Sequence, residues 1–442
     1  MNQKLQNLLT NIELRELLSK SSIDAFLRIS GKVISYIFIY FFIHWLGIRK
    51  YGLWSFAFSL FSFFSLLAGL GFKTSIVKYY TQSKSEKIAF KSVYFKMLKM
   101  LAISSLIMAV LLFVLAQKLA DYADKEQAAT AILFFAFSVV PINILRLNSG
   151  LLKAMRKTAF FGFFEHLGST LFLVIIMVVL NSNKNLSFND TLMAFVISSF
   201  LLMLLSYIPI FNSLRINGVQ SKKSPSYKTI LQESFPMFLT NSSSMIKNWT
   251  DVIILGFFCG PAIVGGYNVL IKISRLIIIP LQSVNTVSVS KISEYFDNRD
   301  FNKIKKLVMS STKIIVLITV PSMLIVAIFK SYILQVFDNR LLQTNYALYI
   351  LLAGQFINAI TGSVSQTLNM TQHQGINMRI SLFTAFLNIL LNIILIPVFN
   401  IYGAAAATAF TLALQNIWSS YYVRKYFGFW PIYLPWPNLK SK

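Results

Sequence analysis

Long apolar runs, separated by short polar segments, make up most of the chain. Each run holds about twenty residues or more, the length that a helix needs to cross about 30 Å of hydrocarbon. The pattern predicts about twelve membrane-spanning helices, at residues 23–47, 51–72, 93–117, 128–150, 158–181, 190–213, 229–258, 264–287, 304–329, 344–369, 378–399 and 402–423. Because the runs are continuous rather than alternating, the pattern excludes a barrel of strands.

The composition indicates the same class of protein. Hydrophobic residues make up 56% of the 442 residues and charged residues only 13%, whereas soluble domains carry about 25% charged residues. We therefore expect an all-α, polytopic membrane protein. The single cysteine, Cys259, excludes a disulfide framework, and the three scattered histidines (His44, His166, His373) leave no cluster for a metal ion, so no metal cofactor is expected.

The distribution of positive charge predicts the orientation. The formal net charge is +26. With the N-terminus in the cytoplasm, the cytoplasmic segments carry 26 Lys and Arg, Lys73 and Arg146 among them, and the outside loops carry only 7. Positively charged loops stay in the cytoplasm, so both termini are predicted to be cytoplasmic. The same loops account for most of the net charge without a nucleic-acid partner.

Five of the remaining basic residues lie deep inside predicted spans: Arg28, Lys32, Lys247, Lys272 and Arg275. A lone cation near the middle of the bilayer costs at least about 2.5–3.5 kcal/mol unless it meets a partner or a wet cavity. Asp24 and Asp251 each lie one helical turn from one of these cations, which would permit internal salt bridges. Five cations exceed two carboxylates, however, and this surplus favours a cationic, water-filled cavity that binds an anion.

Glu165 is a further carboxylate inside a predicted span, next to His166. Burial raises the pKa of a carboxyl group, so Glu165 could load and release a proton during transport. It could equally be the counter-ion of a Lys or Arg in the cavity. His166 is expected to be a packing residue, because adjacent positions on a helix point about 100° apart.

The chain also shows signs of an internal duplication. Met155-Arg156 opens a stretch that ends in an apolar run and Asn181, and Met378-Arg379 opens a similar stretch 223 positions later. Two related halves of six helices are a parallel repeat, which in transporters places the binding site between the halves. Pro236 and Pro280 are predicted bend points, because proline removes a helix hydrogen bond.

These observations predict five segments. Leu5, Leu8, Leu9 and Ile12 recur at helical spacing, so the start of the chain is expected to lie on the inner leaflet as a short helix rather than to be a cleavable signal peptide. The predicted segments are an interfacial helix at 1–22, an N-terminal bundle at 23–213, a basic cytoplasmic linker at 214–228, a C-terminal bundle at 229–425 and a cytoplasmic tail at 426–442.

Three motifs, in this order and spacing, carry a resemblance to a known family. They are Tyr51-Gly52-Leu53-Trp54-Ser55 running to Gly69-Leu70-Gly71-Phe72; Asp251-Val252-Ile253-Ile254-Leu255-Gly256 followed by Val264-Gly265-Gly266-Tyr267; and Ile401-Tyr402-Gly403-Ala404-Ala405-Ala406-Ala407-Thr408. The chain resembles the Wzx-type O-antigen flippases of the polysaccharide-transporter group, whose superfamily includes MATE exporters and lipid II flippases. The resemblance spans nearly the whole chain and implies two pseudo-symmetric six-helix bundles.

The resemblance also implies a function. Such a protein is a transporter and not an enzyme, and it moves undecaprenyl-pyrophosphate-linked O-antigen or capsule repeat units to the outer leaflet of the bacterial inner membrane. An O-antigen polymerase and a chain-length regulator are its expected partners. The anionic cargo would meet Arg28, Lys32, Lys247, Lys272 and Arg275. Asp24, Glu165 and Asp251 would serve as counter-charges or couple transport to H⁺ or Na⁺.

Two other classes share parts of this pattern. A MATE-like exporter of cationic drugs needs a site rich in carboxylates and aromatic rings, and the surplus of cations argues against it. A membrane polymerase or ligase of the same pathway generally needs a sizeable outside loop with acid and base groups, whereas the predicted outside loops are short. Gly31-Lys32 is followed by Val33, so the P-loop pattern of an ATPase is absent from the sequence.

Overall fold

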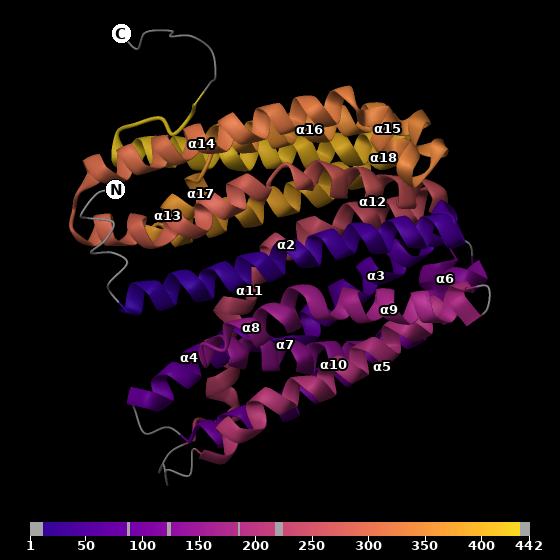
Figure 1. Cartoon of the computed structure of the whole chain (residues 1–442), viewed down its shortest axis with the longest axis horizontal. Helices are drawn as coiled ribbons and strands as arrows, with labels where there is room; N and C mark the ends of the chain where they lie inside the picture. The colour runs from indigo at the N-terminus through magenta and orange to yellow at the C-terminus, as the bar shows by residue number, and fades with distance from the viewer. Residues whose placement is uncertain (1–11, 86–88, 122–124, 184–185, 217–223, 434–442) are drawn as a thin grey trace. The chain divides into compact units, whose positions relative to one another are not determined.

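The computed structural model describes residues 12–85, 89–121, 125–183, 186–216 and 224–433 (Figure 1). Almost all of these residues are helical, and the described ranges contain no strand. The prediction of an all-α membrane protein is therefore confirmed. The chain forms two compact units: unit 1 consists of the described residues up to Gly47 together with Ala57–Ser242, and unit 2 consists of Ile48–Phe56 and the described residues from Ser243 onward.

Unit 1 is built from eight α-helices and one π-helical turn, together with parts of α3 and α11. Its elements, in chain order, are α2 (Ile12–Leu46), α3 (Ile48–Ala68), α4 (Phe72–Ser85), α5 (Phe90–Ala120), α6 (Lys125–Phe137), α7 (Val139–Ala154), α8 (Thr158–Gly162), the π-turn η1 (Phe163–Leu167), α9 (Gly168–Asn183), α10 (Phe188–Ile216) and α11 (Tyr227–Phe258). Helix α7 is the central helix and contacts α4, α5 and α10. Helix α2 packs along α8, η1 and α9. An aromatic cluster of Phe61, Phe135 and Phe195, with ring centroids 4.9–5.8 Å apart, fills part of the core.

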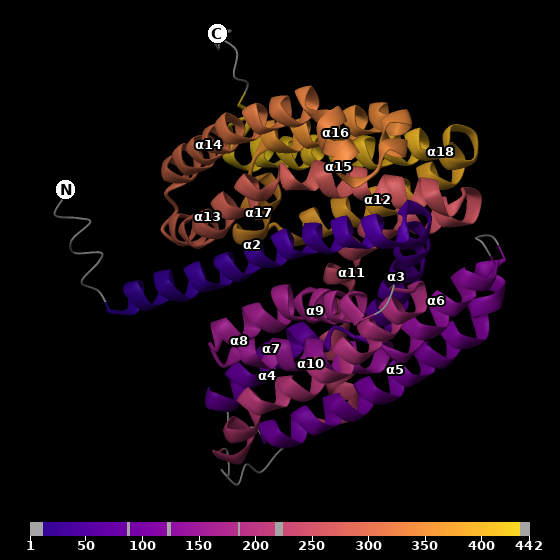
Figure 2. The same ribbon diagram turned by 45° about the vertical axis from the view of Figure 1, so that its right-hand side comes forward.

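Unit 2 contains the remaining helices. They are α12 (Pro261–Leu276), α13 (Ile279–Asp297), α14 (Phe301–Ile328), α15 (Lys330–Phe337), the 3₁₀ turn η2 (Asn339–Thr344), α16 (Asn345–Thr361), α17 (Val364–Met370) and α18 (Gln374–Phe427). Helices α16 and α18 lie side by side in both views (Figures 1 and 2). Asp300 caps α14, and its hydrogen bonds from Lys303 hold the pKa of this carboxyl below its ordinary value.

The number of helical segments agrees with the prediction of about twelve spans. Seven helices among the described residues are long and apolar enough to cross a membrane, and three further bent pairs bring this number to ten. Helix α18 has 54 residues and is broken at Asn400, where φ is 48° and ψ is −125°. This break separates the two predicted spans 378–399 and 402–423. Counting the two parts of α18 separately gives eleven segments. The 32-residue α11, which lies at the predicted span 229–258, is not apolar enough to be counted with them and would be the twelfth.

The borders of the units differ from the predicted domain limits in two places. The border between the units falls after Ser242, within the continuous helix α11, and the first turns of α3 belong to unit 2. The second difference has a steric reason, because a Cβ atom on Gly52 would lie 1.7 Å from the carbonyl oxygen of Pro261. The missing side chain thus lets the start of α3 pack directly on the start of α12. Residues 12–22 continue into α2 as one helix, whereas residues 1–11, 217–223 and 434–442 of the predicted end segments and linker lie outside the described residues.

Among the described residues, four predicted spans contain a break between helices, at the α3–α4, α6–α7, α12–α13 and α16–α17 junctions. Two of these breaks have a local cause in the sequence. Helices α12 and α13 meet at an angle of 47°, and Pro280 lies in the first turn of α13. Proline cannot donate to the preceding turn, so the bend predicted at this position is present. Between α3 and α4 the chain passes through Leu70 and Gly71, with φ of 48° and 75°. A left-handed leucine is unusual, and a Cβ atom on Gly71 would lie 2.6 Å from the Ser234 carbonyl oxygen, so only glycine fits there.

Candidate functional site

Seven charged or titratable side chains of unit 1 gather around the π-turn η1. We call this set the unit 1 charge cluster; it consists of Asp24, Arg28, Lys32, Lys73, Arg146, Glu165 and His166. The π-turn contacts α2 on one side and α7 on another. A single π-turn inside a helix widens the backbone and is frequently found at functional sites. It lets the adjacent residues Glu165 and His166 reach partners on different helices.

One half of the cluster lies on α2. Arg28 Nη2 donates to Asp24 Oδ2 at 2.7 Å, one helical turn away. His166 Nε2 lies 3.5 Å from the other carboxylate oxygen of Asp24. The expectation that His166 is merely a packing residue therefore misses its approach to a carboxylate. Lys32 follows one turn later and interacts electrostatically with Arg28.

The other half surrounds Glu165. Lys73, in the first turn of α4, forms an ion pair with Glu165. Arg146 in α7 also interacts electrostatically with Glu165, and its Nη1 donates to Ser65 Oγ at 2.9 Å. Glu165 thus lies against two cations, and which of the two roles left open for it applies remains a prediction.

Two glycines set the spacing of the helices that carry these charges. A Cβ atom on Gly31 of α2 would lie 2.1 Å from the carbonyl oxygen of His166. A Cβ atom on Gly150 of α7 would lie 2.3 Å from the carbonyl oxygen of Lys73. Small residues at helix contacts let backbones approach closely in membranes. The cluster is therefore held by direct backbone packing of α2 on η1 and of α4 on α7.

In unit 2, Lys247 of α11 is held by neutral groups of α18. Its Nζ donates to Gln415 Oε1 and lies 3.4 Å from both Ser381 Oγ and Thr384 Oγ1. The spacing of Lys247 and Asp251 permits a salt bridge, yet no ion pair joins them in the part of the chain that the structure describes. The hydrogen-bond partners of Lys247 among the described residues are therefore neutral hydroxyl and amide groups, and none of them is a carboxylate.

Asp251 instead lies at the centre of a buried network. Tyr267 donates its hydroxyl to Asp251 Oδ2 at 2.6 Å, and Thr408 Oγ1 donates to the same oxygen at 3.3 Å. Both Asp251 and Tyr267 are fully buried, with exposures of 0%. Because its hydrogen bonds are already made within unit 2, Asp251 joins α11 to α12 and α18. Its sequence-predicted role in ion coupling remains a prediction.

Lys272 and Arg275 lie on α12, one turn apart. Both side chains are half-buried, and the two cations interact with each other electrostatically. Arg275 also interacts with Asp251, the nearest carboxylate of the network described above. The five predicted cations thus fall into two sets: Arg28 and Lys32 in unit 1, and Lys247, Lys272 and Arg275 in unit 2.

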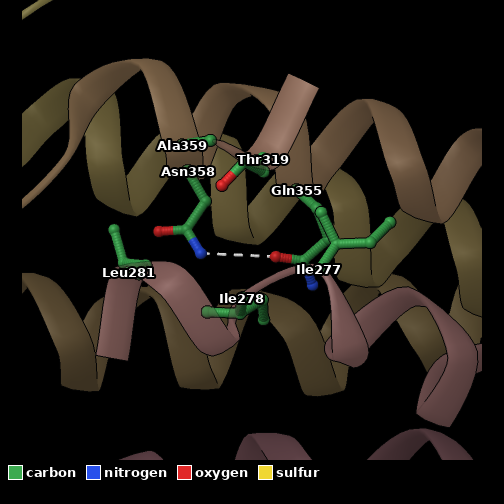
Figure 3. Close-up of a pocket in the computed structure, with 7 residues that line it drawn as sticks. All are labelled: Ile277, Ile278, Leu281, Thr319, Gln355, Asn358 and Ala359. Atoms are coloured by element: carbon green, nitrogen blue, oxygen red, sulfur yellow. Dashed lines mark hydrogen bonds between the residues drawn. The ribbon is translucent and has the colours of Figure 1, made fainter. Parts of the chain in front are cut away.

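A narrow, mostly apolar pocket with three polar side chains lies beside the α12–α13 bend of unit 2 (Figure 3). It is lined by Ile277, Ile278, Leu281, Thr319, Gln355, Asn358 and Ala359. Asn358 Nδ2 donates to Gln355 Oε1 at 3.3 Å, and the Thr319 hydroxyl, only 2% exposed, has no hydrogen-bond partner within the described residues. The polar groups of this pocket are neutral, which sets it apart from the cationic sets.

Lys73 and Arg146 are the two members of the unit 1 charge cluster that the sequence analysis did not identify. Both were counted with the cytoplasmic segments, because each lies near the end of an apolar run. In the structure the helical span that contains Lys73 runs on to Ser83, and Arg146 lies in the middle of α7. Gly69 and Gly71, on either side of Leu70, were the signal in the sequence that a helix breaks just before Lys73. A break inside a span often marks a binding site.

The fold defines the class of protein, a multi-pass membrane protein with the architecture of the MOP superfamily. The structure of the lipid II flippase MurJ, in an inward closed conformation, superposes with a TM-score of 0.71 at 19% identity, over 92% of this chain and 87% of that chain. An inward-facing multidrug resistance MATE family transporter of the MOP superfamily also gives 0.71, at 15% identity, over 91% of this chain and 98% of that chain. Identities this low show a shared fold.

The sequence comparisons identify the family. A family model described as "Polysaccharide biosynthesis protein" matches residues 17–289, and a second, described as "MatE", matches residues 236–394. The chain belongs to the polysaccharide biosynthesis protein family. A protein of Haloferax volcanii, "Probable low-salt glycan biosynthesis flippase Agl15", is 24% identical over 210 residues. That match covers 47% of this chain and 44% of the relative, so it spans less than half of either protein.

Proposed function

We propose that this protein is a flippase for lipid-linked oligosaccharides, which moves glycan repeat units carried on a polyprenyl pyrophosphate across the membrane. The single observation that carries the proposal is Lys247, a cation in a membrane-spanning helix whose hydrogen-bond partners are all neutral. Such a cation is costly in a membrane unless an anion visits it. The family and the flippase named among its relatives support the same activity.

The finer identity of the cargo follows from the resemblance to the Wzx-type flippases. We propose undecaprenyl-pyrophosphate-linked O-antigen or capsule repeat units as cargo, and movement from the cytoplasmic to the outer leaflet of a bacterial inner membrane by alternating access. Both termini are then cytoplasmic, an O-antigen polymerase and a chain-length regulator act next, and H⁺ or Na⁺ supplies the coupling. The pyrophosphate is the part of this cargo that the cations would bind, because charge attraction strengthens where water is partly excluded.

The test of this activity is a strain that lacks the protein. We expect loss of surface glycan and accumulation of single repeat units on the lipid carrier at the cytoplasmic face. Extraction of the lipid-linked intermediates, with and without an impermeant reagent that labels only the outer face, measures both. Single units at the outer face would contradict a flippase and indicate a polymerase step, and unchanged glycan with raised drug sensitivity would favour an exporter, the alternative to which the MatE match points.

Removal of the unit 2 cations tests the site. We expect Lys272→Ala and Arg275→Ala each to reduce surface glycan several-fold at unchanged protein level, because each removes one charge that the pyrophosphate would meet. Surface glycan and membrane-inserted protein are measured in the same cells. Lys330→Ala is a matched control, because this lysine lies over the rings of Tyr346 and Tyr349 at the start of α15 and belongs to neither cationic set. Normal glycan in both α12 variants would contradict the assignment.

A further inference from the structure

We propose that Glu165 is an exchangeable counter-anion: it neutralises Lys73 and Arg146 while no cargo is bound, and the pyrophosphate of the cargo takes its place. This inference rests on the proposed function and adds to it how the unit 1 charge cluster binds and releases an anion. In this cluster, one carboxylate on the π-turn faces two cations from two other helices.

The first step concerns charge. The cluster brings together four cations, Arg28, Lys32, Lys73 and Arg146, and two carboxylates, Asp24 and Glu165. The formal sum of these six groups is +2. One carboxylate carries a single charge, whereas a pyrophosphate group carries more than one and offers several oxygens. The cluster therefore suits a multiply charged anion better than it suits Glu165.

The second step concerns which of the two carboxylates can leave. Asp24 is held by Arg28 from its own helix at 2.7 Å and approached by His166 at 3.5 Å, so it has a partner that moves with it. Glu165 reaches its cations only across helices, at a separation of 92 positions from Lys73. Charge-assisted hydrogen bonds of this kind are strong only while the geometry is kept. A shift of the π-turn by one residue would withdraw Glu165 and leave both cations in place.

The third step concerns the cations after Glu165 has left. Lys73 lies directly after the break at Leu70 and Gly71, in the first turn of the 14-residue helix α4. The start of a helix carries partial positive charge, which favours an anion next to the Lys73 side chain. Arg146 remains anchored by Ser65, whose Oγ lies 3.1 Å from Asn143 Oδ1. Asn143 in turn donates to Ser105 Oγ at 3.1 Å, so a polar chain fixes Arg146 independently of Glu165.

The fourth step concerns access. The side chains of Lys73 and Glu165 are 37% and 22% exposed, so the ion pair is open to a ligand on one side. The close backbone contacts at Gly31 and Gly150 hold α2 and α4 against η1 and α7. A ligand therefore meets cations on closely packed helices and one carboxylate on the π-turn. This is the arrangement expected of a site in which the carboxylate yields to the incoming anion.

The test measures the affinity of the purified full-length protein for inorganic pyrophosphate, by calorimetry in detergent at low ionic strength. Glu165→Gln removes the competing charge and keeps the size of the side chain, so we expect pyrophosphate to bind about five- to tenfold more tightly than to the unaltered protein. Lys73→Gln combined with Glu165→Gln should abolish this gain. The matched control is Glu233→Gln, which removes a carboxylate that pairs at 3.0 Å with Lys78, a lysine on the same helix as Lys73.

The outcomes separate this inference from the proposed function. Equal or weaker binding to Glu165→Gln, or an equal gain in Glu233→Gln, would overturn the exchange even where the deletion strain shows the flippase phenotype. Tighter binding to Glu165→Gln alone would support the exchange even where the deletion strain leaves glycan unchanged. Size-exclusion profiles of all variants identify any that fail to fold, and Glu165→Asp, which keeps the charge on a shorter side chain, should then show no gain in affinity.

Discussion

Gly52→Ala is expected to destabilise the protein severely, although it adds a single carbon atom. In most helices the change from glycine to alanine is favourable by about 1 kcal/mol. At Gly52 the new Cβ atom would lie 1.7 Å from the Pro261 carbonyl oxygen and 2.9 Å from the Gly265 nitrogen. These are backbone atoms and cannot rotate away, so α3 and α12 must separate. We expect a loss of about 3 kcal/mol in the free energy of unfolding, at the upper end of the cost of overpacking.

The measurement is the temperature at which purified protein loses its monodisperse size-exclusion peak. Gly265→Ala should behave similarly, because its Cβ atom would lie 2.5 Å from the carbonyl oxygen of Ile48 at the same crossing. Gly375→Ala is the matched control, since a Cβ atom there meets nothing within 4 Å at the start of α18. A melting temperature of Gly52→Ala equal to that of the control would contradict the crossing of α3 and α12.

The sequence was sufficient to predict the helical class and the approximate number of segments, because hydropathy depends only on local composition. The break at Asn400 even falls between two of the predicted runs. The two glycine motifs at Gly52 and Gly265 could be identified as helix contacts. Their pairing with each other could not, because it depends on a crossing of segments more than two hundred positions apart.

The charged groups show the limit of the same reasoning. The spacing of Lys247 and Asp251 on one helix suggested a pair. In the structure Asp251 instead accepts a hydrogen bond from Tyr267, and Lys247 donates to Gln415, and both partners lie on other helices. Neighbours on one helix contribute only about 0.2–0.5 kcal/mol, so better placed groups from other helices decide the outcome. Depth in the bilayer therefore identified which residues were unusual but not what each one contacts.

The break between α3 and α4 shows how hydropathy can hide a site. The apolar run ends at Phe72, and the lysine that follows resembles the start of a cytoplasmic loop. The helix nevertheless resumes after two left-handed residues and brings Lys73 to Glu165. A polar helical turn inside a span has no hydropathy signal of its own, so the site became visible only when the π-turn and α4 were placed together.

Lys73→Glu is expected to abolish export of glycan almost completely. The substitution puts a second carboxylate next to that of Glu165, and like charges in a partly buried site repel strongly. It also removes a cation that the pyrophosphate would meet. Surface glycan and membrane-inserted protein are again measured together, and the expected result is a roughly tenfold loss of glycan, at a protein level reduced far less.

The combination of Lys73→Glu with Glu165→Lys separates the two reasons for this loss. The double variant restores an ion pair, so protein level should return to that of the unaltered chain. Export should return only in part, because the π-turn would then carry the cation and α4 the carboxylate, and the exchange would be reversed. Lys78→Glu is the matched control, since Lys78 lies on the same helix with similar exposure and pairs with Glu233. Full export by the double variant would mean that Glu165 is a fixed structural partner of Lys73. An equal loss of export in Lys78→Glu would mean that the total charge of α4 matters rather than this ion pair.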